Sequence, residues 1–447
     1  MSSRNRLITL IAAGTAAVLM AAVALAAVLN QPKETARPEP VAVTVPVALR
    51  ADGLAKDVSV GVILTLGQSG EPGSEYNRAA QGAVVAAQRF AQGGTPVSLQ
   101  AENDKGTEDG ARAAVRALSG QGVSGVVITS TGPQAQAAAQ TAAELGLPAI
   151  LPYSEPTAAA PAVWTTGPTA AAVDTALQTA LAGKARVLLV EDGATAPASV
   201  PRVQTLSLGN FADVLAMAQE AAIQTGDQLR PLADGAPDGA EPNRIAEPAD
   251  AVVVTAATPQ RLARIVQALQ SRDVSVPLIL PAGAASPQFA TTLAELDGTA
   301  SGQLVTVAPA GGDATALQQN AQGRGMSAFL SAVRLAAGDT GVLNLVGDAS
   351  FAADAWAADP RSHDAVVALT RAAALARSNE PGKVGAALET MSFGPGEGLA
   401  GPALDFSQPA ALTAPAVPAY ASAQDLGLRP ADNDAPRLVW VPAPAGS

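Results

Sequence analysis

The 447-residue sequence contains no cysteine and a single histidine, His363. Without cysteine there are no disulfides, no thiolate metal sites, no cysteine nucleophile and no cysteine to carry a lipoprotein anchor. One histidine excludes a metal site built from several histidines. We therefore expect neither a resident metal nor another cofactor.

Aromatic residues are also scarce, at 3% of the chain, although 48% of the residues are hydrophobic. Alanine, valine and leucine must therefore form most of the core. Alanine loses no side-chain entropy in a helix and has the highest helix propensity. The composition predicts many alanine-rich helices and is unlike that of disordered chains, which are poor in valine, isoleucine and leucine.

Positively charged residues are also few: the chain has 27 lysines and arginines against 39 aspartates and glutamates. The formal net charge is -12, and the basic residues are scattered along the chain. A nucleic-acid partner requires lysine and arginine clustered on one face, so we expect none. The negative charge favours solubility and says little about the fold.

The N-terminus carries an uncharged apolar run from Leu7 to Leu29, after Arg4 and Arg6. A helix of about 23 residues is roughly 34 Å long, enough to cross a hydrocarbon core of about 30 Å. The arginines should remain cytoplasmic, which predicts a membrane anchor in residues 1–30 and an extracytoplasmic body. A cleaved signal peptide, with its site at residues 24–26, is the alternative. The proline-bearing residues 31–56 are typical of an extended linker.

The body alternates short β-branched runs with alanine-rich amphipathic stretches. In the first half we predict strands at 58–64, 96–102, 123–129 and 147–152, and helices at 76–92, 108–120 and 133–145. In the second half we predict strands at 185–191, 251–255, 277–280 and 302–308, and helices at 169–181, 210–224 and 260–271. Helices follow near 326–337 and 362–378, the latter with Ser362 as N-cap. This alternation predicts an α/β fold of parallel sheets covered by helices.

Several of these runs, in this order, resemble the type I periplasmic binding proteins, most closely the branched-chain amino-acid-binding proteins of ABC importers. They are Val60–Gly67, Gly82–Ala83, Leu99–Asp104, Gly122–Ile128, Leu147–Pro152, Ala249–Thr255, Val276–Pro277, His363–Ala368, Phe393–Gly398 and Leu404–Phe406. The resemblance covers residues 57–443. It implies two lobes, 57–165 with 310–394 and 166–309 with 395–443. Three crossings would join them, near 165–169, 308–312 and 393–398.

The resemblance also implies a ligand site at the carboxyl ends of the strands. The family holds a ligand carboxylate with small hydroxyl residues at a helix N-terminus, which points to Ser130 and Thr131; orphan amides and the helix dipole favour an anion there. An ordinary N-cap is the alternative. Other candidates are Ser69 in the preceding loop, Tyr153 and Ser154 after the fourth strand, and Glu191 in the second lobe.

The acid that pairs with a ligand ammonium in this family is absent. Ala282, Gly283 and Ala284 occupy the expected place, so an ordinary α-amino acid fits poorly.

Enzyme signatures are lacking. The one glycine-rich motif, Gly396, Gly398 and Gly401, follows no convincing strand and opens no helix, so it does not indicate a dinucleotide site. No serine is placed to form a triad with His363.

We expect a non-enzymatic extracytoplasmic protein that binds a small polar, amino-acid-like ligand between its lobes, with an ABC permease as the possible partner. The alternative is a sensor or interaction module of the cell envelope in which the cleft has degenerated.

Overall fold

The structure is a computed structural model that describes residues 47–67, 71–154, 159–232, 241–301, 303–309, 311–394, 396–430 and 435–443. The expected membrane segment, residues 1–30, the linker as far as residue 46, and Ser69 lie outside the described residues. Within the described ranges, no helix has both the length and the apolar character needed to span a bilayer.

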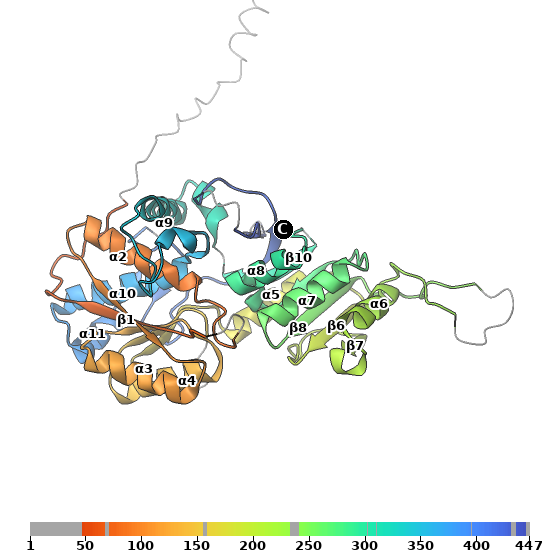
Figure 1. Ribbon diagram of the computed structural model, residues 1–447, viewed down its shortest axis with the longest axis horizontal. Coiled ribbons are helices and arrows are strands. Elements are labelled where there is room, and N and C mark those ends of the chain that lie inside the picture. The colour runs from red at the N-terminus through yellow and green to blue at the C-terminus, as the bar shows by residue number, and fades with distance from the viewer. Residues whose placement is uncertain are drawn as a thin grey trace, which may run out of the picture. The chain divides into compact units, whose positions relative to one another are not determined.

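One lobe is built on a five-stranded parallel sheet in the order β2-β1-β3-β4-β5. It is the left-hand body of Figure 1, where β1 is labelled. Its strands are β1 (Ser59–Leu64), β2 (Ser98–Asn103), β3 (Val126–Ile128), β4 (Ala149–Leu151) and β5 (Val163–Thr165). Its helices are α2 (Gly82–Gln92), α3 (Glu108–Gly120), α4 (Gly132–Glu144), α9 (Ala321–Gly338), α10 (Pro360–Ala376) and α11 (Pro381–Leu388). We call this the first lobe.

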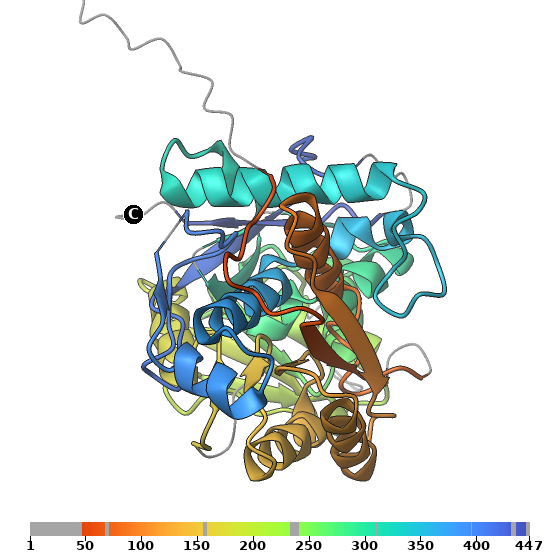
Figure 2. The same ribbon diagram turned by 90° about the vertical axis from the view of Figure 1, so that its left-hand side faces the viewer.

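Alternate residues of β1 face two different cores, as the two-residue period of a strand requires. Val60 and Val62 pack with α2, α9, α10 and α11 on one face of the sheet, whereas Ile63 packs with α3 and α4 on the other. Figure 2 turns this lobe toward the viewer, with α9 running across the top and α10 and α11 in blue. Helices on both faces explain why the central strands are almost entirely apolar.

The second lobe is built on a seven-stranded sheet in the order β14-β13-β10-β9-β8-β6-β7. Its strands are β6 (Val187–Asp192), β7 (Gln204–Ser207), β8 (Ala251–Ala256), β9 (Leu278–Leu280), β10 (Leu304–Pro309), β13 (Ala416–Ser422) and β14 (Val439–Pro442). Its helices are α5 (Ala170–Ala180), α6 (Val214–Gln224), α7 (Pro259–Gln270) and α8 (Pro287–Glu295). Strand β13 pairs antiparallel with both β10 and β14, whereas the pairs among the other five strands are parallel. The two-lobed α/β fold expected from the sequence is therefore present.

The chain passes between the lobes in three places. The first passage lies between β5 and α5, and the second follows β10. The third comes after Ala411, because Leu399, Phe406 and Ala411 still pack in the core of the first lobe. We expected this passage near 393–398. The glycine-rich stretch instead lies against α9, where a Cβ on Gly325 would be 2.3 Å from the Leu399 carbonyl oxygen. A short ribbon, β11 (Ser392–Phe393) with β12 (Leu404–Asp405), closes this stretch.

Helix α10 begins two residues earlier than its predicted cap. Asp359 is the N-cap, and its carboxylate accepts a hydrogen bond of 2.8 Å from the Arg361 amide. Pro360 suits the first helical position because that position needs no amide donor. The prediction that Ser362 caps the helix is wrong: its hydroxyl is buried and donates to the Ala79 carbonyl at 2.7 Å.

Candidate functional site

The carboxyl ends of β3 and β4, which are neighbouring strands, carry four of the residues predicted to bind ligand. Ser130 follows β3 and is fully buried. Thr131 is the N-cap of α4, but its hydroxyl donates to the Glu75 carboxylate at 2.7 Å. The structure therefore places a carboxylate of this chain beside the start of α4, where the resemblance implies the carboxylate of a ligand.

Ser130 lies beside a buried acid that follows β2, Asp104. The Asp104 carboxylate accepts from the Gly106 amide at 2.9 Å. Burial raises the pKa of Asp104, although the Gly106 amide and the nearby hydroxyls of Ser130 and Thr65 act to lower it. These hydroxyls cluster around an internal carboxylate, so the Ser130 side chain faces the protein interior.

Tyr153, which follows β4, is part of a stack. Its ring lies 4.2 Å from that of Tyr76, with an angle of 2° between the planes. The Arg361 guanidinium lies over both rings, 4.4 Å from the centre of Tyr153 and 5.4 Å from that of Tyr76. Burial raises the pKa of both tyrosines, so they stay neutral at physiological pH.

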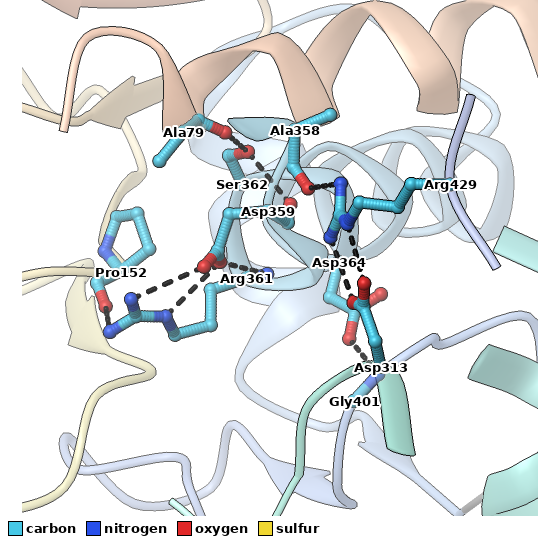
Figure 3. Close-up of polar contacts among 10 residues, drawn as sticks. All are labelled: Ala79, Pro152, Asp313, Ala358, Asp359, Arg361, Ser362, Asp364, Gly401 and Arg429. Atoms are coloured by element: carbon cyan, nitrogen blue, oxygen red, sulfur yellow. Dashed lines mark hydrogen bonds and ion pairs between the residues drawn. The ribbon is translucent and has the colours of Figure 1, made fainter. Parts of the chain in front are cut away.

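Asp359 holds the Arg361 guanidinium in this stack through hydrogen bonds of 3.1 and 3.3 Å. A third bond, of 3.5 Å, reaches the Pro152 carbonyl (Figure 3). Burial alone would lower the pKa of Arg361, but the Asp359 carboxylate, Tyr153 and Tyr76 together outweigh it and the pKa is raised. The first lobe thus covers its own strand ends with a cation, a carboxylate and two aromatic rings.

The last two predicted residues take different positions. Ser154 is adjacent to the stack, and its hydroxyl is buried with no hydrogen-bond partner among the described residues. Glu191 lies at the end of β6 in the second lobe, where it accepts a 2.5 Å hydrogen bond from the Ser207 hydroxyl. Its neighbour Asp192 pairs with Arg261 at 3.1 Å. No described residue therefore joins Glu191 to the candidates of the first lobe, and the six site residues remain predictions.

A cavity of about 350 Å³ lies between the lobes, beside the passages that connect them. The first lobe contributes Met326, Trp356, Arg361 and Leu404, and the second contributes Ser286, Ala290 and Trp440. None of the residues predicted to bind ligand lines it. The long connection between β13 and β14, in its described residues 423–430 and 435–438, forms much of one wall. We call these residues the strap.

The strap reaches the first lobe through Arg429. Its guanidinium binds Asp313 through hydrogen bonds of 2.5 and 2.9 Å and donates to the Ala358 carbonyl at 3.0 Å (Figure 3). It also donates to the Ala355 carbonyl at 3.2 Å. Burial would lower the pKa of Arg429, but the Asp313 and Asp359 carboxylates together outweigh it and the pKa is raised. All three nitrogens of the Arg429 guanidinium therefore donate hydrogen bonds within the protein.

Three buried polar side chains beside the cavity, those of Arg89, His363 and Asp364, are linked by hydrogen bonds. Asp364 accepts from the amides of Ala400 and Gly401, each at 2.8 Å, and from Nδ1 of His363 at 2.7 Å. The other ring nitrogen of His363 accepts from Arg89 at 2.9 Å, because a guanidinium can only donate. Burial lowers the pKa of His363 and holds it neutral. Arg89, His363 and Asp364 are thus all hydrogen-bonded within the protein.

The residues that line the cavity and carry charge were not found by sequence reasoning. The only signal for Asp359 and Arg361 was their place beside Pro360 at the start of a helix. Arg429 had no signal, because it lies far along the chain from Asp313, Ala355 and Ala358. Among the described residues, no group of three histidine, cysteine, aspartate or glutamate side chains could hold a metal ion.

No protein-family model matches the sequence, and no curated protein matches it either. Solved structures do match the fold. A type I periplasmic binding protein from Bordetella pertussis Tohama I is 15% identical, with a TM-score of 0.56, over 87% of this chain and 100% of that one. The branched-chain amino acid transporter substrate-binding protein LivJ from Streptococcus pneumoniae, in complex with isoleucine, is 17% identical, with a TM-score of 0.53, over 81% and 100%.

The leucine-binding protein LivK from Thermotoga maritima is similar as well. It is 16% identical, with a TM-score of 0.55, over 86% of this chain and 99% of that one. These matches extend over nearly the whole length of each solved chain and include both lobes. At this level of identity the matches show the fold and do not identify the ligand. The chain has the two-lobed α/β fold of type I periplasmic binding proteins.

Proposed function

We propose that this protein binds a small solute between its two lobes, outside the cytoplasm, and presents it to an ABC importer. The observation that carries the proposal is the cavity, which is lined from both lobes in a fold whose similar structures are named as binding proteins. A solute that contacts both lobes stabilises one relative position of the lobes, and a permease can recognise that position. The expected N-terminal anchor would keep the protein at the membrane.

A second function is favoured by a specific observation. The strand ends of the first lobe are covered by the chain's own Glu75, Arg361 and two tyrosines. This arrangement supports an envelope sensor or interaction module whose strand-end cleft no longer accepts amino acids. A non-enzymatic role agrees with both proposals.

A thermal-shift screen of the full-length protein tests the solute-binding proposal. The panel contains leucine, isoleucine, other amino acids, small carboxylates, polyols and uncharged aromatic compounds. A ligand present at 100 times its Kd should stabilise the folded protein by about 2.7 kcal/mol. An unchanged melting temperature with every compound would contradict solute binding and favour the sensor or interaction module.

A further inference from the structure

Most of the charged residues around the cavity are bonded within the protein. Asp313 pairs with Arg429, and Asp359 pairs with Arg361. The Asp364 carboxylate accepts from two amides and from His363. The remaining charged lining residues, Asp425 and Arg437, are exposed and opposite in sign. A charged solute would therefore lose its hydration while the partly buried charges of the wall are already paired, and the charges left to meet it, on Asp425 and Arg437, are exposed to water.

Apolar contacts are offered from both sides instead. Trp356 of the first lobe and Trp440 of the second line the cavity, together with Met326, Leu404 and Leu428. Trp440 is held in place because its indole N–H donates to the Ala284 carbonyl at 3.2 Å, and its ring lies 6.5 Å from that of Phe289. Aromatic side chains with a fixed orientation contribute large apolar contact areas.

We infer that the solute of this cavity is an uncharged, largely apolar small molecule rather than a zwitterionic amino acid. The inference rests on the proposed solute-binding function. Two observations of the cavity agree with it: the paired charges of the wall and the two tryptophans.

Calorimetric titration of the full-length protein with indole, leucine and isoleucine tests this inference. We expect indole to bind and the two amino acids not to bind. Ala285→Phe fills the cavity and should weaken indole binding by at least about tenfold. Ala282→Phe, in the same 3-10 turn (Ala282–Ala285) but outside the lining, is the matched control and should leave the affinity unchanged.

The outcomes separate the two claims. Binding of leucine or isoleucine without indole would overturn the apolar class and leave the solute-binding function in place. Indole binding that Ala285→Phe does not weaken would place the site elsewhere and overturn the inference. Absence of binding by all three probes, and by every compound of the thermal-shift panel, would overturn both.

A different observation concerns the strap. Both strands that flank it, β13 and β14, belong to the sheet of the second lobe. Within the strap, Leu428 packs against the core of the first lobe, and Arg429 binds three of its residues. On the return, Trp440 packs in the second lobe. The strap is thus bonded to both lobes beside the three covalent passages.

The geometry points to the strap as a latch that holds the lobes at a fixed separation. The hydrogen bonds of Arg429 attach this latch to the first lobe. Replacing Arg429 leaves the partly buried Asp313 carboxylate and two carbonyls without their donor. Besides the three passages, which are single strands of chain, and the strap, a further hydrogen bond between described residues of the two lobes is the exposed one of 3.2 Å from Arg78 to the Thr291 hydroxyl. Loss of the latch should therefore let the lobes move apart.

The lack of cysteine allows a clean distance measurement. Spin labels at Arg116→Cys on α3 and Arg264→Cys on α7, both exposed, report the separation of the lobes in the full-length protein by electron resonance. Arg429→Gln should broaden and lengthen the distance distribution, whereas Arg437→Gln, on the same strap but exposed, should not. Identical distributions for Arg429→Gln and the parent, with the circular dichroism of both unchanged, would overturn the latch.

Discussion

In the first lobe, the side chains of Arg89, Asp104 and Asp364 are each less than 5% exposed, whereas the buried polar side chains described in the second lobe are threonines and a serine. Buried charge is tolerated only where partners surround it, because an ion loses its hydration on burial. The difference indicates that the first lobe has a polar framework around α10, while the second is stabilised mainly by apolar packing. Three predictions test this contrast.

The largest effect is expected from Arg89. Its guanidinium donates to His363 and, at 2.7 Å, to the Val47 carbonyl, and burial lowers its pKa to about 10. Arg89→Met should destabilise the protein by about 3–5 kcal/mol, because Asp364 and the carbonyl lose their compensating cation. Denaturant unfolding measures the loss. In the second lobe, Arg261→Met removes a solvent-exposed ion pair and should cost about 0–1 kcal/mol. Equal losses for the two variants would contradict the contrast.

A second, smaller effect concerns the close packing of α2 against α10. A Cβ on Gly82 would lie 2.0 Å from the Asp359 carbonyl oxygen, so the two helices approach closely only because this residue is glycine. Gly82→Ala should destabilise the protein by about 1–3 kcal/mol through overpacking. Gly382→Ala, in α11 with no neighbour within 4 Å, is the control and should be neutral or slightly stabilising. If both substitutions shifted the unfolding midpoint in the same direction and by the same amount, the packing argument would be refuted.

The third prediction concerns pH. His363 has a folded-state pKa below its ordinary value of 6.5 because it is buried, so the unfolded chain binds a proton more readily. Its contribution to stability is therefore complete above pH 6.5. It declines as the pH falls from 6.5 toward the folded-state pKa, by at most about 1.4 kcal/mol per pH unit. In His363→Gln, the melting temperature should therefore depend less on pH between 6.5 and 5 than it does in the parent. Parallel curves of melting temperature against pH for the variant and the parent would exclude this role of His363.

Much of the fold could be predicted from the sequence, because periodic apolar runs and glycine stops mark most elements. Helix α3 has the predicted bounds, 108–120, and Thr107 caps it through a 3.0 Å bond from the Gly110 amide. Short or exposed elements gave no such signal. Five elements were not predicted because they are brief, polar or interrupted by proline: β5, β7, α8, α11 and β13.

The candidate site was less predictable for a physical reason. Strand ends can be located from the sequence, which is why Ser130, Tyr153 and Ser154 were named. What covers those ends depends on residues brought there by tertiary packing. Arg361 comes from α10, some 200 residues after Tyr153, and Arg429 comes from the strap. Local patterns carry no information on such contacts, so the pairing of charge around the cavity required the structure.

The central claim is that one solute contacts both lobes at once, and the three tryptophans of the chain allow it to be tested directly. Trp356 and Trp440 line the cavity from opposite lobes, whereas Trp164 is buried in the first lobe and donates to the Phe406 carbonyl at 2.8 Å. With 5-fluorotryptophan in all three positions, fluorine resonances of the full-length protein should be recorded during titration with indole. We predict that the Trp356 and Trp440 signals shift together with one affinity while Trp164 stays fixed. A shift confined to one lobe, or none at all, would contradict a solute held between the lobes.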